Sequence, residues 1–118
     1  MRELRDYAEG AVEKGALAVI LVGSLARGDY TAFSDADITI IIEKTDERPM
    51  DRTVRYMEPK MSIDIDLRVY AIKEIRIMIE KRARTIEEIA KHGILLGGDE
   101  RIIEEIRKIM KIKHLGSP

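Results

Sequence analysis

The stretch Leu21–Ile42, LVGSLARGDYTAFSDADITIII, carries the pattern that decides the fold and the candidate site. An apolar run ends in Gly23 and Ser24, and a second apolar run starts with two aspartates one residue apart, Asp35 and Asp37. A glycine and a serine after a strand are typical of a phosphate site, whereas paired aspartates are typical of a metal site. The remaining sequence must decide whether the two patterns belong together.

Length and composition indicate one globular unit. The chain has 118 residues, so we expect a single domain over residues 1–118. Hydrophobic residues make up 45% and charged residues 36% of the sequence, which is far from the composition of a disordered chain. The net charge of -1 does not favour binding of duplex nucleic acid. No apolar run reaches the length of a membrane span and the N-terminus is not a signal peptide, so we expect a cytoplasmic protein.

The metal chemistry open to this chain is narrow. Cysteine is absent and there are only two histidines, which lie in separate segments. Disulfides, thiolate catalysis and cysteine-type zinc sites are therefore excluded. A bound metal would be held mainly by oxygen, which favours magnesium, manganese or calcium.

Apolar periodicity predicts a small α+β fold. Helical spacing of apolar residues predicts an amphipathic helix over residues 2–14. Continuous apolar runs predict buried strands over 16–23 and 36–43, and strict alternation predicts a strand over 61–70. Residues 72–91 have helical periodicity with a break near Thr85. This order predicts a mixed sheet with helices packed on one side.

The last part of the chain and one long connection complete this expectation. Residues 93–98 predict a short edge strand, and Asp99 has the position of a cap for a final helix. That helix has an apolar stripe, which we expect to face the core or, if the sheet cannot cover it, to form a homo-oligomer or partner interface; it consists of Ile102, Ile103, Ile106, Ile109 and Met110. Residues 44–60 contain two prolines and lack clear periodicity, so we expect a functional or mobile loop there.

The spacing of four aspartates along two predicted strands indicates that their side chains share faces of the sheet. Asp35 and Asp37 are two residues apart at the head of a strand, so their side chains project from the same face. Asp64 and Asp66 share a face of the third predicted strand for the same reason. If the two strands pair, three carboxylates converge, and a divalent cation would relieve their repulsion. From spacing alone, Asp64 and Asp66 are both candidates for the third position.

Such an oxygen cluster can hold two metal ions about 3.5 to 4 Å apart, the arrangement used in phosphoryl and nucleotidyl transfer. Gly23 permits close backbone approach to a phosphate, the Ser24 hydroxyl adds a donor, and Arg27 can neutralise phosphate charge. The phosphate pattern and the acidic pattern therefore describe one site. The loop lacks the lysine of an NTPase phosphate loop and the middle glycine of a dinucleotide-binding turn, and the acidic stretch does not match an EF-hand.

These residues resemble a known family. Gly-Ser, three residues, Gly, then Ser-Asp-x-Asp at the head of a strand, with a later Asp in an alternating strand, is similar to the polymerase beta nucleotidyltransferase superfamily. The form GSLARG followed by SDAD resembles the minimal nucleotidyltransferases that are encoded beside HEPN partners. The resemblance covers about residues 17–98 and implies the nucleotidyltransferase fold. The spacing from Asp66 to the following KEI, as in these relatives, favours Asp66 over Asp64 as the third carboxylate.

The resemblance implies a magnesium-dependent transfer of AMP from ATP to a hydroxyl group of a partner, a tyrosine of a HEPN-type toxin, by which the protein acts as an antitoxin. Gly23 and Ser24 would bind phosphates, while Asp35, Asp37 and Asp66 would bind metal, with Asp66 assisting deprotonation of the acceptor. A small-molecule or RNA acceptor is an alternative, although the sequence lacks the second domain and the basic surface that such acceptors need. A non-catalytic antitoxin that blocks its toxin sterically is another.

Overall fold

The two central strands form where the sequence is apolar on both faces. The computed structural model describes the backbone of residues 1–115 and the side chains of residues 1–111. β1 (Ala18–Val22) is buried over its first four residues, and every residue of β2 (Ala36–Ile42) is buried except Asp37, which is half-buried. The two strands pair antiparallel, with Val22 opposite Asp37. A strand that is apolar throughout is stable only when both faces of its sheet are covered.

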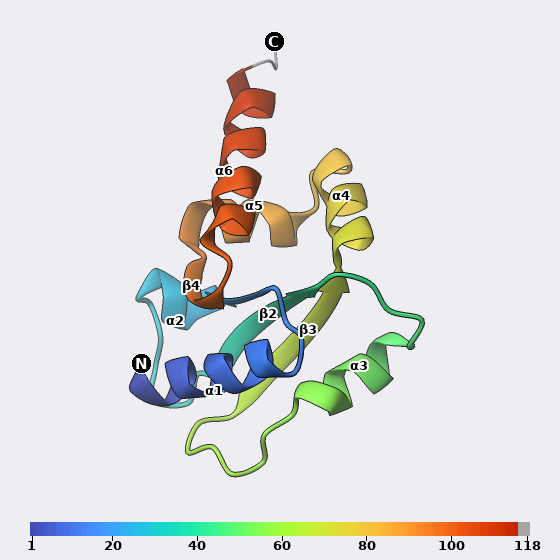
Figure 1. Ribbon diagram of the computed structural model, residues 1–118. Helices are drawn as coiled ribbons and strands as arrows, with labels where there is room; N and C mark the ends of the chain where they lie inside the picture. The colour runs from blue at the N-terminus through green and yellow to red at the C-terminus, as the bar shows by residue number, and fades with distance from the viewer. Residues whose placement is uncertain (116–118) are drawn as a thin grey trace.

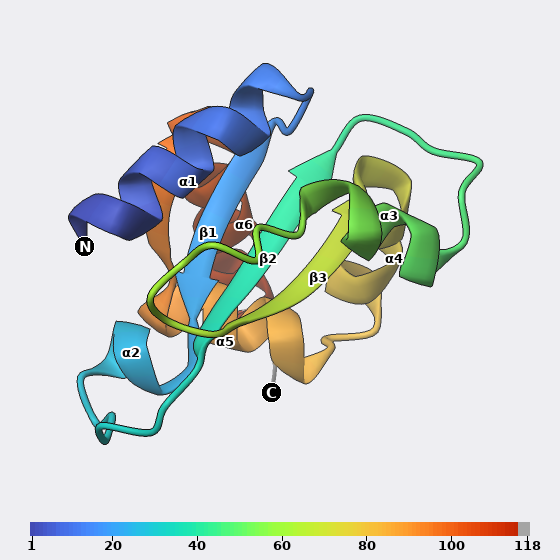
Figure 2. The same cartoon turned by 90° about the horizontal axis from the view of Figure 1, so that it is seen from below.

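Two further strands complete a mixed sheet, as expected. β3 (Ile65–Ala71) pairs parallel with β2, on the side away from β1 (Figure 2). β4 (Ile94–Gly98) pairs antiparallel with β1 at the opposite edge, so the strand order is β3-β2-β1-β4. The predicted third strand began at residue 61, whereas β3 begins at Ile65. β3 is shorter than predicted because its partner β2 begins only at Ala36, which pairs with Ile65.

Helices cover both faces of the sheet, which corrects the expectation that they lie on one side. One face carries α1 (Arg2–Glu13) and α3 (Pro49–Tyr56), and the other carries α4 (Ile72–Glu80), α5 (Arg84–His92) and α6 (Glu100–Leu115) (Figure 1). The short α2 (Gly23–Arg27) follows β1 directly. The physical reason is that both central strands present apolar side chains in both directions, and each face buries a separate cluster.

The connection over residues 44–60, expected to be a loop, contains α3. Pro49 occupies the first turn of this helix, a position that tolerates proline because the first backbone N–H groups have no partner within the helix. Tyr56 at its end is buried in the same cluster as α1, and Tyr7 of α1 donates a 2.6 Å hydrogen bond to the Tyr56 carbonyl. The segment is therefore tied to the sheet.

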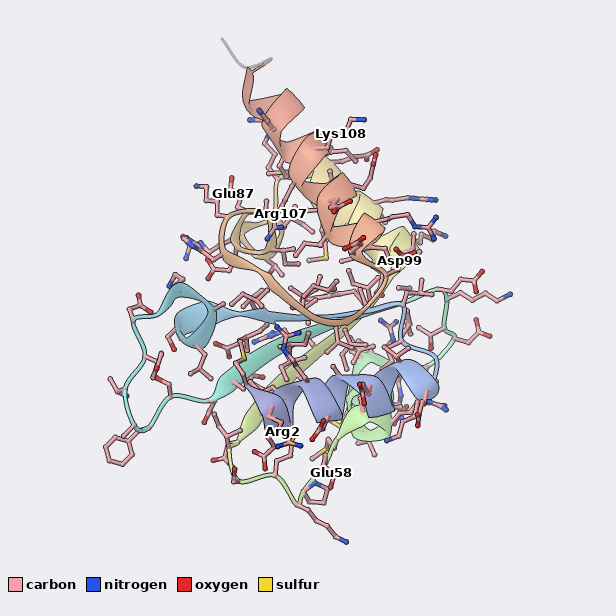
Figure 3. All side chains as sticks on the ribbon, turned by 60° about the vertical axis from the view of Figure 1, so that its left-hand side comes forward. Arg2, Glu58, Glu87, Asp99, Arg107 and Lys108 are labelled. Atoms are coloured by element: carbon pink, nitrogen blue, oxygen red, sulfur yellow. The ribbon has the colours of Figure 1, made fainter. Side chains whose placement is uncertain are left out.

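The later helices follow the sequence expectation closely. The break predicted near Thr85 lies between Glu80 and Arg84, where α4 ends and α5 begins. Asp99 precedes α6, and its Oδ1 accepts the backbone N–H of Arg101 at 2.9 Å (Figure 3). Ile103 and Ile106 are buried against the sheet and α5, and the other members of the stripe pack partly against this cluster. No helix in the described part of the chain is long and apolar enough to cross a membrane.

Candidate functional site

The parallel pairing of β2 and β3 places two of the predicted carboxylates side by side. Asp37 is the direct register partner of Asp66. Alternation along β2 directs Asp37 toward the face that also receives Ile41, which packs under α4, α5 and α6. Asp35 lies one residue before β2 and on the same side of the alternation as Asp37. The carboxylates therefore meet at the ends where β2 and β3 begin, on the face covered by the last three helices.

The electrostatics of Asp37 reflect this crowding. Its pKa is raised, first by partial burial and then by the negative charges of Asp66 and Asp35. The positive charges of Arg68 and Arg27 act in the opposite direction but do not cancel the increase. The protein alone thus holds Asp37 in surroundings that disfavour its ionised form. A cation bound beside it would reverse that effect.

Gly23 connects the phosphate pattern to the acidic pattern by direct contact. The residue has a φ of +75°, a conformation that favours glycine. A Cβ atom built at this position would lie 2.0 Å from Oδ2 of Asp37, far inside van der Waals contact. The backbone of Gly23 therefore packs directly against the Asp37 carboxylate. Any other residue at position 23 would place its Cβ atom where the carboxylate lies. The two patterns that the sequence suggested to be one site are adjacent in space.

A pocket opens at this point with a volume of about 430 Å³, within the range of small-molecule sites. Four of the residues predicted from the sequence line it, namely Gly23, Arg27, Asp37 and Asp66. Ser24 and Asp35 are not among the residues that line it, although Asp35 acts on Asp37 through its charge.

The other walls of the pocket include residues of β2, β3 and α5 that the sequence motifs did not assign to the site. The additional polar lining residues are Thr39, Arg68, Arg84, Thr85 and Glu88. Arg68 could have been found, because it follows Asp66 by two residues and must share its face of β3. The pocket residues of α5 could not have been identified from the sequence, because nothing in their local sequence indicates that α5 packs beside α2. The lining of the pocket thus contains three arginines, Arg27, Arg68 and Arg84, and three carboxylates, Asp37, Asp66 and Glu88.

Arg27, predicted as a phosphate ligand, already has protein partners. Its Nε donates to Oδ2 of Asp29 at 3.3 Å, and its Nη1 donates to Oε1 of Glu88. Glu88 belongs to α5, 61 positions further along the chain. The hydrogen bond to Glu88, followed by the one to Asp29, raises the pKa of Arg27 and keeps the guanidinium charged.

Asp64 and Asp66 occupy different environments. Asp66 lies in β3 and lines the pocket, whereas Asp64 precedes the strand and is not among the lining residues. The Asp64 carbonyl accepts the backbone N–H of Ala36 at 2.8 Å, so the residue helps to start the pairing of β3 with β2. Both aspartates are exposed, so their positions relative to the pocket distinguish them, not their exposure.

The donor chemistry of the site fits a hard divalent cation. Within the described residues, no three His, Cys, Asp or Glu side chains stand close enough to form a complete metal site on their own. Asp37 and Asp66 nevertheless provide adjacent carboxylate oxygens, with Asp35 two residues from Asp37, and partial burial followed by the negative charges of Asp66 and Asp35 raises the pKa of Asp37. Carboxylate oxygens are the ligands that magnesium prefers, with water or substrate phosphates completing its shell.

Comparison with known proteins places this geometry in context. The model of the nucleotidyltransferase domain family matches residues 2–113. No curated protein matches the sequence significantly.

Several solved structures share the fold. One is a protein from Sulfolobus solfataricus described as a nucleotidyltransferase, with 22% identity, a TM-score of 0.54, and coverage of 80% of this chain and 76% of that chain. A toxin–antitoxin with AMP-PNP matches with 16% identity and a TM-score of 0.56 over 94% of this chain and 88% of that one. A mutant form of the toxin–antitoxin MntA–HpeT matches with 20% identity and a TM-score of 0.56 over 91% and 87%. These similarities confirm the fold expected from the sequence.

Proposed function

Because the chain belongs to the nucleotidyltransferase domain family, we propose that it transfers AMP from ATP to a hydroxyl group of a partner protein in a magnesium-dependent reaction. The partner we infer is a HEPN-type toxin, the acceptor is a tyrosine, and the modification is the antitoxin activity.

The observation that carries this proposal is the contact between Gly23 and Asp37. The backbone of Gly23 packs against the Asp37 carboxylate, and Asp66 is in register with Asp37 on the next strand. A polyphosphate beside Gly23 would therefore lie next to the carboxylates that can hold a metal. Phosphoryl transfer is catalysed mainly by positioning and charge stabilisation, and this arrangement provides both.

Each predicted residue has a role in the proposed reaction. Gly23 lets the chain approach the polyphosphate closely, and Ser24 provides a hydroxyl donor in the same turn. Arg27 neutralises phosphate charge from the pocket wall. The oxygens of Asp35, Asp37 and Asp66 would hold magnesium, which, when bound, supplies positive charge to the reacting phosphate and to the leaving group.

The proposed step breaks one bond and forms one. The acceptor oxygen attacks the α-phosphorus of ATP, the bond to the bridging oxygen of the β-phosphate breaks, and pyrophosphate leaves. The proton of the acceptor hydroxyl passes to the carboxylate of Asp66, the pocket-lining acid that belongs to an exposed residue and is therefore open to an incoming partner.

Two features support a protein acceptor. Two of the similar structures are those of toxin–antitoxins, and one of them was solved with AMP-PNP. The pocket is of a size for a nucleotide, and Asp66, which lines it, is an exposed residue that an incoming protein can reach. An acceptor that another protein brings to the open side of β3 suits this arrangement.

The test is label transfer with the product of the adjacent gene. The protein, MgCl2 and this partner are incubated with ATP labelled at the α-phosphate, and in parallel with ATP labelled at the γ-phosphate. Label from the α-phosphate alone should remain on the partner, and Asp37→Asn should abolish it. If no adenylyl group reaches the partner and Asp37→Asn changes nothing, the proposed activity is wrong.

The same experiment separates the alternatives. α-Label in added RNA or in small-molecule fractions, with none on protein, would indicate a different acceptor for the same chemistry. An Asp35→Asn, Asp37→Asn protein that still neutralises the toxin fully would indicate steric inhibition without catalysis.

A further inference from the structure

Arg27 is held between two carboxylates from distant parts of the chain. Asp29 accepts from Nε two residues away, and Glu88 accepts from Nη1 across the gap between α2 and α5. Both Arg27 and Glu88 line the pocket. Their side chains are 36% and 26% exposed, so the pair is shielded more than a freely solvated surface pair. The contact therefore fixes one wall of the candidate site.

The guanidinium retains donors after both contacts are made. It has five N–H groups in one plane, and the two hydrogen bonds engage Nε and Nη1. Nη2 has no hydrogen-bond partner among the described residues. Two anchors on one planar group set the direction of the remaining donors, and a long, flexible side chain fixed in advance loses less conformational entropy when a ligand binds.

We propose that Glu88 is a positioning residue for the nucleotide: it holds Arg27 at the pocket wall so that the free Nη2 edge meets the polyphosphate of a nucleoside triphosphate. This inference rests on the proposed function and extends it to α5. It gives a role to an acidic residue that would by itself repel phosphates. Paired with Arg27, Glu88 instead directs a cation toward them.

Glu88 stands on α5, a helix that packs into the core and lines the pocket. α5 has two isoleucines buried without solvent exposure, Ile86 and Ile89, on either side of Glu88 in sequence. The carboxylate that anchors Arg27 is therefore mounted on a helix that is packed into the core. Sites whose supporting groups stand on rigid elements are more precisely set than sites held by loops alone.

The test is nucleotide binding by calorimetry with AMP-PNP and MgCl2 as the probe. Glu88→Ala should weaken binding by about 10-fold, by analogy with the lower end of the losses seen when the hydrogen-bond partner of a metal ligand is removed. Glu88→Gln keeps an acceptor oxygen for Nη1 and should lose less. Glu87→Ala is the matched control, because Glu87 is exposed on the same helix and is not among the pocket residues (Figure 3), and it should bind as the wild type does.

A double-mutant cycle tests whether Glu88 affects nucleotide binding through Arg27. If Glu88 acts through Arg27, Glu88→Ala should cause no further loss in an Arg27→Ala background. In steady-state assays the KM for ATP should rise while kcat changes by less than about two-fold, since the interaction is uniform binding. A thermal melt of each variant checks that it is folded, and Glu88→Gln provides the measurement if Glu88→Ala is not.

Two results would overturn the inference while the proposed function stands. One is wild-type or tighter affinity in Glu88→Ala, which would mean that Glu88 competes with phosphate for Arg27. The other is an equal loss with and without Arg27. A wild-type protein that binds no AMP-PNP and transfers no AMP would instead overturn the proposed function, and this inference with it.

Discussion

At the scale of single residues, Gly23 is the position where a minimal change should have the largest effect. Its φ is +75°, and an added Cβ would lie 2.0 Å from the Asp37 carboxylate. Gly23→Ala should destabilise the fold by about 1 to 2 kcal/mol for the left-handed backbone conformation alone. It should also displace Asp37 and abolish detectable AMP-PNP binding. Chemical denaturation and calorimetry measure the two effects separately.

Gly28 provides the matched control. It has a similar φ of +88°, but a Cβ there would meet nothing within 4 Å. Gly28→Ala should therefore show the backbone cost without the loss of nucleotide binding. Equal binding losses in the two variants would mean that the contact with Asp37 is not what the site requires at Gly23.

The choice between Asp66 and Asp64 as the third carboxylate can also be tested at single residues. Asp66 pairs with Asp37 and lines the pocket, whereas Asp64 contributes its carbonyl to the start of β3. Asp66→Asn should abolish AMP transfer, and Asp64→Asn, which leaves that carbonyl in place, should only weaken it. Label transfer to the partner protein measures both. The reverse ranking would assign the third carboxylate to Asp64.

At the scale of secondary-structure elements, Arg52 joins α3 to the junction of β3 and α4. The side chain is 11% exposed, and its Nη1 donates to Oε1 of Glu74 at 2.6 Å and to the Val69 carbonyl at 3.3 Å. The same Oε1 accepts the backbone N–H of Ala71. Arg52→Ala removes a charged donor from the buried Val69 carbonyl and from the half-buried Glu74 carboxylate, so it should lower the free energy of unfolding by about 1 to 3 kcal/mol. Urea denaturation measures the change.

Arg55 on the same helix is the control for Arg52. It pairs with Glu47, but its side chain is 56% exposed. Exposed ion pairs contribute about 0 to 1 kcal/mol, so Arg55→Ala should cost no more than that. Similar losses in both variants would show that the position of α3 does not depend on the buried contacts of Arg52.

The contact between α1 and α3 predicts a dependence of stability on alkaline pH. Burial, and then the charges of Tyr56 and Glu58, raise the pKa of Tyr7 above its ordinary value of 10.0. An acid whose pKa is raised on folding stays neutral longer in the folded state, so stability is complete below pH 10 and falls as the pH rises further. Tyr7→Phe should lose about 1 kcal/mol at neutral pH, where its hydrogen bond to Tyr56 is missing.

The stability difference between the wild type and Tyr7→Phe should depend on pH. The difference in unfolding free energy between the wild type and Tyr7→Phe should shrink above pH 10, because only the wild type must keep this hydroxyl protonated. Urea denaturation at pH 7 and at several values above 10 measures it. A gap that stays constant would mean that Tyr7 does not titrate with unfolding.

Elements with strong periodicity were predictable, and contacts between distant elements were not. The runs that formed β1 and β2 were identified because they are continuous and apolar, but the same runs should have predicted cover on both faces rather than one. α3 was missed because it is short and has few apolar residues, although Pro49 marks its first turn. Gly23 and Asp37 could be assigned to one site from their positions beside two buried strands, whereas Asp66 was preferred to Asp64 only from the resemblance to known relatives. Glu88 was not predicted, because its proposed role depends on how α5 packs beside α2.

At the scale of the whole molecule, both helical layers rest on the same two strands. Ile20 and Ile41 belong to the cluster under α4, α5 and α6, while their neighbours Leu21 and Ile40 belong to the cluster under α1 and α3. Loosening either layer exposes one face of the central strands and so weakens support for the other. We therefore predict one cooperative unfolding transition, as in most single domains of this size.

Matched core truncations in the two layers test this cooperativity. Leu4→Ala in α1 and Ile86→Ala in α5 each remove a buried aliphatic side chain and should each cost about 2 to 5 kcal/mol. Hydrogen exchange followed by mass spectrometry should show that either variant lowers protection in α1 and in α5 by the same free energy, because both exchange through global unfolding. If Ile86→Ala lowers protection only in α4, α5 and α6, the layers unfold separately. In that case α5 could detach from the pocket without loss of the sheet, and Glu88 could not act as a fixed anchor for Arg27.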